Sequence, residues 1–282
     1  MLKTSEILNG TQIAKKYLEA AKKELKNLQN EKDMTPLLAT IQVGSSADTE
    51  VYSKYLSGLL ERVGIEHRAI KLSNNTEESK LIHEIERLNR DASVTGIMIF
   101  APLPKSIDPL RVMDALDPRK DVEGRTFLKS HLGVFSPTAN AVLTLIEATG
   151  IDLKGKEAVV VGHSDLVGKP AAVLLLDLHA TVTVCHKETK NLEQKVRNAD
   201  VVVAAVGKPN VIKGDWIKSG AVVIDVGENM LDGKLVGDVE FESAREKAAF
   251  ISPVPGGVGP VTNVMLIKNL IALCRLNGQR KG

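Results

Sequence analysis

The chain has 282 residues, which is enough for two domains of ordinary size. Hydrophobic residues make up 43% and charged residues 26%, a globular composition, and the formal net charge of +2 gives no reason to expect a nucleic-acid partner. Cys185 and Cys274 are the only cysteines, so no disulfide framework is expected and a reducing cytoplasm fits. The N-terminus lacks a signal peptide's apolar core, and no apolar run is long enough to cross a membrane.

Helices and strands are predicted to alternate along the first half of the chain. Apolar residues recur at helical spacing over residues 9–30, which predicts one long helix with a buried stripe. The predicted strands that follow are 37–43, 65–72 and 94–100, and the predicted helices are 48–63, 76–89, 109–116 and 138–149. Residues 117–125 are polar and predict turns. This alternation predicts an α/β domain, which we place at residues 1–149.

The second half predicts another α/β domain, at residues 150–260. Short β-branched runs predict strands at 158–161, 181–184, 201–205 and 222–226, with a further short strand near Phe250. Because helices are expected between them, we predict a Rossmann-like, doubly wound parallel sheet. Residues 253–262 hold so much proline and glycine that neither a helix nor a central strand is expected there. The segment 261–282 is predicted to be mainly helical and to join the first domain, with a cleft between the two domains.

The turn after the first strand of the second domain indicates a cofactor site. Gly162, His163 and Ser164 break the strand, Gly168 follows, and a helix is predicted over 171–178. A strand, a glycine turn and a helix open the βαβ unit that binds dinucleotides, in which small residues admit the diphosphate and the helix N-terminus faces it. The fingerprint is partial, because Ser164 stands at the second glycine position. A tight turn in an ordinary α/β domain is the alternative.

The end of the next strand bears on the choice of cofactor. In NAD-binding domains this strand often ends in an acidic residue that binds the ribose 2′-hydroxyl. Here it ends in Cys185-His186-Lys187, with no acid at that position, although Glu188 comes next. Basic groups at this point, together with His163, favour a 2′-phosphate and therefore NADP. A solvated lysine and a packed histidine are the alternative.

Nine runs of residues carry a resemblance that covers nearly the whole chain. In the first half they are VGSSADTEVYSKYLSGLLERVG, APLPKSID and PRKDVEG. In the second half they are VVVGHSDLVGKPAAVLL, TVTVCHK, ADVVVAAVGKP, AVVIDVGEN, GKLVGDVEF and SPVPGGVGPVTNVMLIKN. Together, and in this order, they resemble the bifunctional methylenetetrahydrofolate dehydrogenase and methenyltetrahydrofolate cyclohydrolase (FolD) family.

The resemblance implies an NADP-linked oxidation of 5,10-methylene-tetrahydrofolate to 5,10-methenyl-tetrahydrofolate, followed by hydrolysis to 10-formyl-tetrahydrofolate, in one-carbon metabolism. It implies a first domain that binds the tetrahydrofolate derivative, a second that binds NADP, a homodimer and no metal. It places Gly162, His163, Ser164, Gly168, Lys187, Gly207 and Glu228 at the cofactor. At the substrate it places Tyr52, Leu56, Phe100, Pro102, Asp121, Gly259, Pro260 and Thr262, of which Tyr52 and Asp121 are the catalytic candidates.

Two substrate positions depart from the family's pattern. The family carries a tyrosine and, one helical turn later, a lysine on the same face of a helix. Here Tyr52 is followed at that distance by Leu56, and Lys54 lies roughly opposite Tyr52, so it does not take the lysine's place. The glutamine that helps to hold the lysine in the family is Phe100 here. We therefore expect a drier and more apolar pocket without that titratable group.

These departures affect the two reactions differently. Hydride transfer needs substrate and cofactor to be oriented, whereas hydrolysis needs a positioned group that moves protons. We therefore predict a dehydrogenase whose cyclohydrolase activity is weak or lost. A fully bifunctional enzyme, in which another group replaces the lysine, and a nucleotide-binding paralogue without folate chemistry are the alternatives. Outside the family context, Tyr52 and Leu56 would be core residues and Asp121 a turn cap.

Three cofactor positions also depart from the family. Lys187 stands where many members have serine, and it could restore charge lost at His163, where arginine is common. Glu228 stands where the family has a hydrophobic residue after Asp-Val-Gly. The sequence gives no account of a carboxylate at that position.

Overall fold

The computed structural model describes residues 5–32, 34–44, 46–130 and 133–278. The chain forms two compact units, one made of residues 1–17 and 136–265 and the other of residues 18–135 and 266–282. Two long helices, α1 (Gly10–Lys32) and α10 (Val258–Gly278), contribute residues to both. This division differs from the predicted boundary at residue 149, because α6 (Pro137–Glu147) packs against α7 of the first unit.

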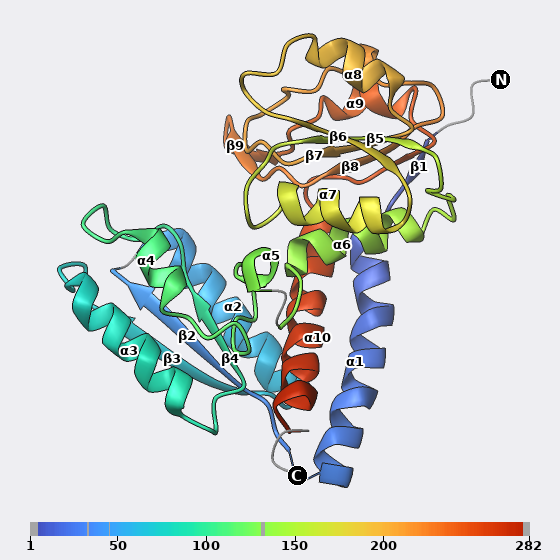
Figure 1. Ribbon diagram of the computed structural model, residues 1–282. Coiled ribbons are helices and arrows are strands. Elements are labelled where there is room, and N and C mark those ends of the chain that lie inside the picture. The colour runs from blue at the N-terminus through green and yellow to red at the C-terminus, as the bar shows by residue number, and fades with distance from the viewer. Residues whose placement is uncertain (1–4, 33, 45, 131–132, 279–282) are drawn as a thin grey trace. The chain divides into compact units, whose positions relative to one another are not determined.

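The first unit, called here the six-stranded unit, contains a fully parallel sheet. Its strand order is β1-β11-β8-β7-β5-β6. The strands are β1 (Glu6–Ile7), β5 (Glu157–Val161), β6 (Thr181–Cys185), β7 (Val201–Ala204), β8 (Val222–Asp225) and β11 (Phe250–Ile251). Helices α6 and α7 (Gly168–Asp177) cover one face, and α8 (Leu192–Asn198) and α9 (Phe241–Arg245) cover the other (Figure 1). The predicted doubly wound parallel sheet is confirmed.

The valine-rich composition of the central strands follows from this arrangement. Every residue of β7 and β8 is buried, as expected for parallel strands covered by helices on both faces. Counted from the β6 edge, the sheet order is β6-β5-β7-β8-β11, which is 2-1-3-4-5 when these five strands are numbered in chain order. The order therefore reverses between β5 and β7, and ligands of such sheets bind outside the carboxyl ends of the strands at this reversal.

Several short elements of the six-stranded unit were not predicted from the sequence. Strand β1 has two residues, and β9 (Asn229–Leu231) and β10 (Lys234–Val236) have three each, which is too short for a periodic pattern. The β9–β10 hairpin turns at Asp232-Gly233, both with positive φ (50° and 75°). An Asp-Gly pair is the usual sign of a two-residue hairpin turn, so the sequence did carry this signal. The single-turn 3₁₀ helix η1 (Gly214–Trp216) was also not predicted.

The second unit, the three-stranded unit, has the parallel order β3-β2-β4. Its strands are β2 (Leu37–Val43), β3 (Glu66–Leu72) and β4 (Gly96–Ile99), and its helices besides α1 and α10 are α2 (Ala47–Val63), α3 (Glu78–Arg90), α4 (Pro109–Asp114) and α5 (Phe127–Ser130). Alternate residues of β2 face two cores: Leu38 packs with α1, α2 and α10, whereas Ile41 packs with α3 and α4. The predicted N-terminal α/β fold is confirmed.

Two helices begin three residues earlier than predicted. Helix α7 begins at Gly168, which leaves Pro170 in the first turn. Helix α10 begins at Val258, so the expectation that residues 253–262 contain no helix was wrong for residues 258–262. Proline is tolerated in a first turn because backbone N–H groups there have no partner within the helix. Among the helices in the described part of the chain, none combines the length and hydropathy needed to cross a bilayer.

Candidate cofactor and substrate sites

The turn between β5 and α7 requires glycine at two positions. Gly162 has a φ of 120°, which side-chain-bearing residues rarely adopt, and a Cβ there would lie 2.1 Å from the carbonyl oxygen of Ala205. A Cβ on Gly168 would lie 2.1 Å from the carbonyl oxygen of Gly162. The strand end, the turn and the helix start are therefore packed backbone against backbone.

Ser164 has a structural role where the usual fingerprint has its second glycine. Its Oγ accepts hydrogen bonds from the backbone N–H of Val167 (3.2 Å) and Gly168 (3.5 Å). The N-cap of α7 is Val167, which makes no side-chain cap bond, so Ser164 satisfies the N–H groups at the helix start from three and four residues earlier in the turn. The hydroxyl thus shapes the turn so that α7, ten residues long, begins beside the carboxyl end of β5, the usual place of a bound diphosphate.

Basic side chains gather at the ends of β5 and β6. The rings of His163 and His186 lie 5.2 Å apart between centroids, and both residues are exposed. Lys187 is also exposed, and its Nζ lies 3.8 Å from Glu188 Oε1. The backbone N–H of Glu188 donates to His186 Nδ1 (3.3 Å). His186 was not among the predicted site residues, and only its ring contact with His163 reveals its position.

Two buried aspartates hold the loops that follow β7 and β8. The carboxylate of Asp238 accepts the backbone N–H groups of Val206, Gly207 and Lys208. Asp225 accepts three further N–H groups, among them that of Asp238 (2.9 Å). Burial raises the pKa of Asp225 to about 6, although these donors favour its charged form. The predicted residue Gly207 is therefore positioned by Asp238, which lies within the family-like run GKLVGDVEF but was not singled out.

Glu228 lies beside the start of α10. A Cβ on Gly259 would lie 3.0 Å from Glu228 Oε1, and Gly259 belongs to the first turn of that helix. The positive end of a helix dipole favours a carboxylate, which gives this residue a physical account. Two further predicted residues share the turn: Pro260 is half-buried, and the hydroxyl of Thr262 donates to the carbonyl of Val258 (3.2 Å).

In the three-stranded unit, the predicted pair on α2 packs against Phe100. Leu56 is completely buried and Phe100 is 7% exposed, both in the core formed with α1 and α10. The Tyr52 ring, partly buried, meets the Phe100 ring edge-on, with centroids 6.0 Å apart. Position 56 therefore offers an apolar side chain inside an apolar core, without a group that could transfer a proton.

The carboxylate of Asp121 closes a turn. It is 1% exposed, and it accepts hydrogen bonds from the backbone N–H and the hydroxyl of Thr126 (2.7 and 2.8 Å) and from the N–H of Glu123 (3.2 Å). Burial raises the pKa of Asp121, and the hydrogen bonds from Thr126 oppose that shift. Both carboxylate oxygens are thus engaged in holding the 121–126 turn.

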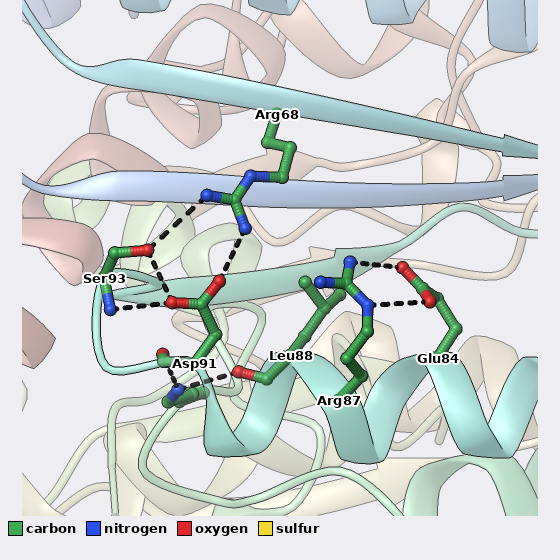
Figure 2. Close-up of polar contacts among 7 residues, drawn as sticks. Arg68, Glu84, Arg87, Leu88, Asp91 and Ser93 are labelled. Atoms are coloured by element: carbon green, nitrogen blue, oxygen red, sulfur yellow. Dashed lines mark hydrogen bonds and ion pairs between the residues drawn. The ribbon is translucent and has the colours of Figure 1, made fainter.

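Lys120 anchors this turn to the end of α3. Its Nζ donates to the backbone carbonyls of Leu88 (2.8 Å) and Asp91 (2.6 Å), as a cation at a helix C-terminus should. Figure 2 shows these carbonyls beside the ion pair of Arg68 with Asp91, which Ser93 also contacts. The role of this lysine could not be predicted from the sequence, because its partners lie about thirty residues away along the chain.

Phe100 and Pro102 also line a cavity of about 210 Å³ at the carboxyl ends of β2 and β4. Its lining contains Gln42 and Thr49 but, of the predicted substrate residues, only Phe100 and Pro102. Gly259, Pro260 and Thr262 belong to the six-stranded unit. The predicted substrate residues are thus distributed over both units.

Comparison with known proteins identifies the family. Residues 8–123 match the tetrahydrofolate dehydrogenase/cyclohydrolase catalytic domain, and residues 136–277 match the NAD(P)-binding domain of the same family. A protein of Neisseria gonorrhoeae named bifunctional protein FolD is 43% identical over 281 residues, covering 97% of this chain and 99% of that protein.

Two solved structures agree with this match. The bifunctional enzyme FolD of Campylobacter jejuni is 37% identical, covers 96% of this chain and 99% of its own, and superposes with a TM-score of 0.92. The Trypanosoma brucei methylenetetrahydrofolate dehydrogenase-cyclohydrolase, crystallised with NADP cofactor and an inhibitor, is 34% identical, covers 97% and 98%, and has a TM-score of 0.90. With matches of this extent on both units, the chain belongs to the tetrahydrofolate dehydrogenase/cyclohydrolase family.

Proposed function

We propose that this protein oxidises 5,10-methylene-tetrahydrofolate to 5,10-methenyl-tetrahydrofolate with NADP as the hydride acceptor. The observation that carries the proposal is the β5–α7 turn in a chain of this family, with two close-packed glycines, a helix N-terminus and basic side chains at the adjoining strand ends. The relative from Trypanosoma brucei, crystallised with NADP, supports the same cofactor.

The residues of the turn would bind different parts of the cofactor. The start of α7 suits the diphosphate, and His163 with Lys187 suits a 2′-phosphate, since backbone N–H groups, an imidazole N–H and an ammonium can all donate hydrogen bonds to phosphate oxygens. NADP supplies the hydride chemistry, and the protein's contribution is orientation. Tyr52, Phe100, Pro102, Asp121, Gly259, Pro260 and Thr262 are proposed to line the folate site. Asp121 would act chiefly by holding the 121–126 turn, because Thr126 and Glu123 already engage its oxygens.

For the cyclohydrolase step, the relatives and the side chain at position 56 favour different outcomes. The relatives named above as bifunctional favour a protein that also hydrolyses the methenyl product, and they weigh against the loss predicted from position 56. The specific observation that keeps the loss as a second candidate is Leu56, which is fully buried in the same core as Phe100. The resemblance implies a lysine and a glutamine at these two positions.

One assay tests both steps. The purified protein is given methylene-tetrahydrofolate and NADP, and reduced cofactor and methenyl product are followed separately by absorbance. We expect reduced cofactor to form. Decay of the methenyl product faster than in buffer supports the bifunctional enzyme, and decay at the buffer rate supports the loss. If no reduced cofactor forms, the proposed dehydrogenase is wrong.

We also propose a homodimer, as the family resemblance implies. Sedimentation equilibrium at several protein concentrations tests it. A single species at the mass of one chain would contradict it.

A further inference from the structure

Glu228 carries a negative charge that the proposed reaction does not require. Strand β8 ends at Asp225, three residues before it, and the side chain is exposed. The resemblance implies a hydrophobic residue at this position. Within the part of the chain that the structure describes, no hydrogen bond or ion pair engages the carboxylate. An exposed charge without a counter-ion on the protein is available to a bound molecule.

The backbone around Glu228 is held on both sides by the two buried aspartates. The N–H of Gly227 donates to Asp225 Oδ1 (3.0 Å), and the side-chain amide of Asn229 donates to Asp238 Oδ1 (2.9 Å). A Cβ on Gly227 would lie 2.2 Å from Asp238 Oδ1, so the chain passes close to that carboxylate. Glu228 therefore projects from a fixed point of the backbone.

The side chain of Glu228 lies against the first turn of α10. A Cβ on Gly259 would lie 3.0 Å from Glu228 Oε1, so the glycine leaves room for the carboxylate. Both residues belong to the six-stranded unit, which also contains the proposed cofactor residues. The positive end of the helix favours this negative charge, and that interaction by itself would only stabilise the start of α10.

The order of the strands indicates which end of the cofactor meets Glu228. The sheet order β6-β5-β7-β8 puts Lys187, the proposed contact of the 2′-phosphate, after β6 and the diphosphate turn after β5. A dinucleotide lies across the carboxyl edge of such a sheet, with one half on each side of the reversal in strand order. With the adenosine half at β6, the nicotinamide half falls to β7 and β8, whose following loops contain Gly207 and Glu228.

The two redox forms of NADP differ in charge at the nicotinamide ring. The oxidised ring is a pyridinium cation and the reduced ring is neutral, whereas the diphosphate and the 2′-phosphate are the same in both forms. A carboxylate beside the ring attracts the cation and has no such attraction for the neutral ring. The charge of Glu228 thus acts on one redox form only.

We propose that Glu228 shifts the binding preference of this protein towards NADP⁺ over NADPH, through attraction between its carboxylate and the oxidised nicotinamide ring. The inference rests on the proposed function, because it requires NADP to bind at the β5–α7 turn. It separates two kinds of specificity: Lys187 and His163 distinguish NADP from NAD, and Glu228 distinguishes the oxidised form from the reduced form.

Binding of the two redox forms without folate tests the proposal. NADP⁺ and NADPH are titrated separately into the full chain, and calorimetry gives a Kd for each. Glu228→Gln keeps the size of the side chain but removes its charge. The Kd of NADP⁺ divided by that of NADPH should then rise by about two- to fivefold, as expected for one exposed pair of opposite charges. Glu228→Lys, which puts a positive charge beside the ring, should raise this ratio further.

Glu188→Gln is the matched control, because it removes the same charge beside Lys187, at the opposite end of the cofactor. The 2′-phosphate is the same in both redox forms, and at about 0.15 M salt a charge so far from the ring is largely screened. The two Kd values should therefore change together and their ratio should stay constant. Circular dichroism checks that all three variants fold.

The possible results separate this proposal from the proposed function. If both forms bind and their Kd ratio is the same in the unaltered protein, Glu228→Gln and Glu228→Lys, this proposal is wrong and the NADP site stands. That result is the one expected if Glu228 only stabilises the start of α10. An equal change of the ratio in Glu188→Gln would also overturn the proposal. Binding of neither form to the unaltered protein would overturn both the proposal and the assignment of NADP.

Discussion

At the scale of single residues, the side chain at position 56 is the basis for predicting weak or lost cyclohydrolase activity. A leucine there is fully buried in an apolar core together with Phe100, and Tyr52 packs against the same residues. The resemblance implies a lysine and a glutamine at positions 56 and 100, so the predicted departure involves two side chains in one core. A lysine placed there alone would be buried without its amide partner, which disfavours the charged form.

The first prediction is a double-mutant cycle on cyclohydrolase activity. Leu56→Lys alone should recover little hydrolysis, and Leu56→Lys with Phe100→Gln should recover more than the two single changes suggest, because neighbouring groups act as a unit. A functional lysine would raise the hydrolysis rate by about 10²–10⁴-fold. Methenyl-tetrahydrofolate decay is the measurement.

The same variants give a stability control. Leu56→Lys should destabilise the protein by roughly 3 kcal/mol or more, whereas Val51→Lys, on the same helix and 71% exposed, should change stability by less than about 0.5 kcal/mol. Additive effects in the cycle would show that the two side chains do not act as a unit. Fast hydrolysis by the unaltered protein would show that another group performs this step.

The second prediction concerns Lys187, which is exposed at the end of β6. If it contacts a 2′-phosphate, Lys187→Glu should weaken the binding of NADP by the contribution of one charge-assisted hydrogen bond, about 1.5–3 kcal/mol. The binding of NAD should be weakened much less. The measurement is kcat/KM with each cofactor. Lys190→Glu, also exposed and three residues further on, is the matched control and should leave the preference intact. An NAD preference in the unaltered protein would contradict the assignment of NADP.

At the scale of elements, the end of α3 joins several segments of the three-stranded unit. Arg68 of β3 pairs with Asp91 (2.7 Å), Ser93 donates to the same carboxylate, and Lys120 binds the nearby carbonyls (Figure 2). Through Lys120, this network also anchors the 121–126 turn. The hydrogen bonds from Ser93, followed by those from Arg68, hold the pKa of Asp91 well below its usual range.

The third prediction follows from the sign of that shift. An acid whose pKa is lowered by folding stabilises the folded protein at pH values above its pKa in the unfolded chain, which is near 3.8. This stabilisation is lost as the pH falls below that value. Asp91→Asn should therefore lower the free energy of unfolding by about 1–2 kcal/mol at pH 7. The difference in this free energy from the unaltered protein should shrink between about pH 4 and about pH 2. Denaturant unfolding at several pH values measures it. The exposed Asp232→Asn serves as control. A difference that does not change with pH would show that Asp91 acts through something other than its charge.

At the scale of the whole molecule, the family match covers both compact units, and each keeps its own parallel sheet. The proposed cofactor residues all belong to the six-stranded unit, so a dinucleotide bound to them would stabilise that unit directly. The turn that would hold it depends on backbone packing at Gly162 and Gly168.

The fourth prediction is a cofactor-dependent rise in thermal stability. At NADP concentrations near 100 times Kd, the stabilisation should be about 2.7 kcal/mol, because the cofactor binds only the folded chain. NAD at the same concentration should raise the melting temperature less. Differential scanning calorimetry is the measurement, and if the units unfold separately, only one transition should move. An equal rise with NAD and NADP would contradict the proposed phosphate contact.

The sequence alone determined most of the framework. Strand β2 was predicted at its observed bounds, and β5 to β8 within one residue at either end. These strands are short runs rich in apolar and β-branched residues, a pattern that the sequence shows directly. The glycine turn after β5 and the family motifs could also be recognised from the residues. The start of α10 was not, since proline and glycine suggested a loop where they occupy a first helical turn.

The tertiary structure decided the side-chain partners. It showed that Ser164 accepts a backbone N–H at the start of α7, that Asp121 closes a turn and that Gln42 Oε1 is left without a partner among the described residues. Helix and strand patterns depend on neighbouring residues, so the sequence shows them directly. Hydrogen-bond partners such as Lys120 and Leu88 are brought together only when distant segments pack, which is why their roles could not be derived from the chain alone.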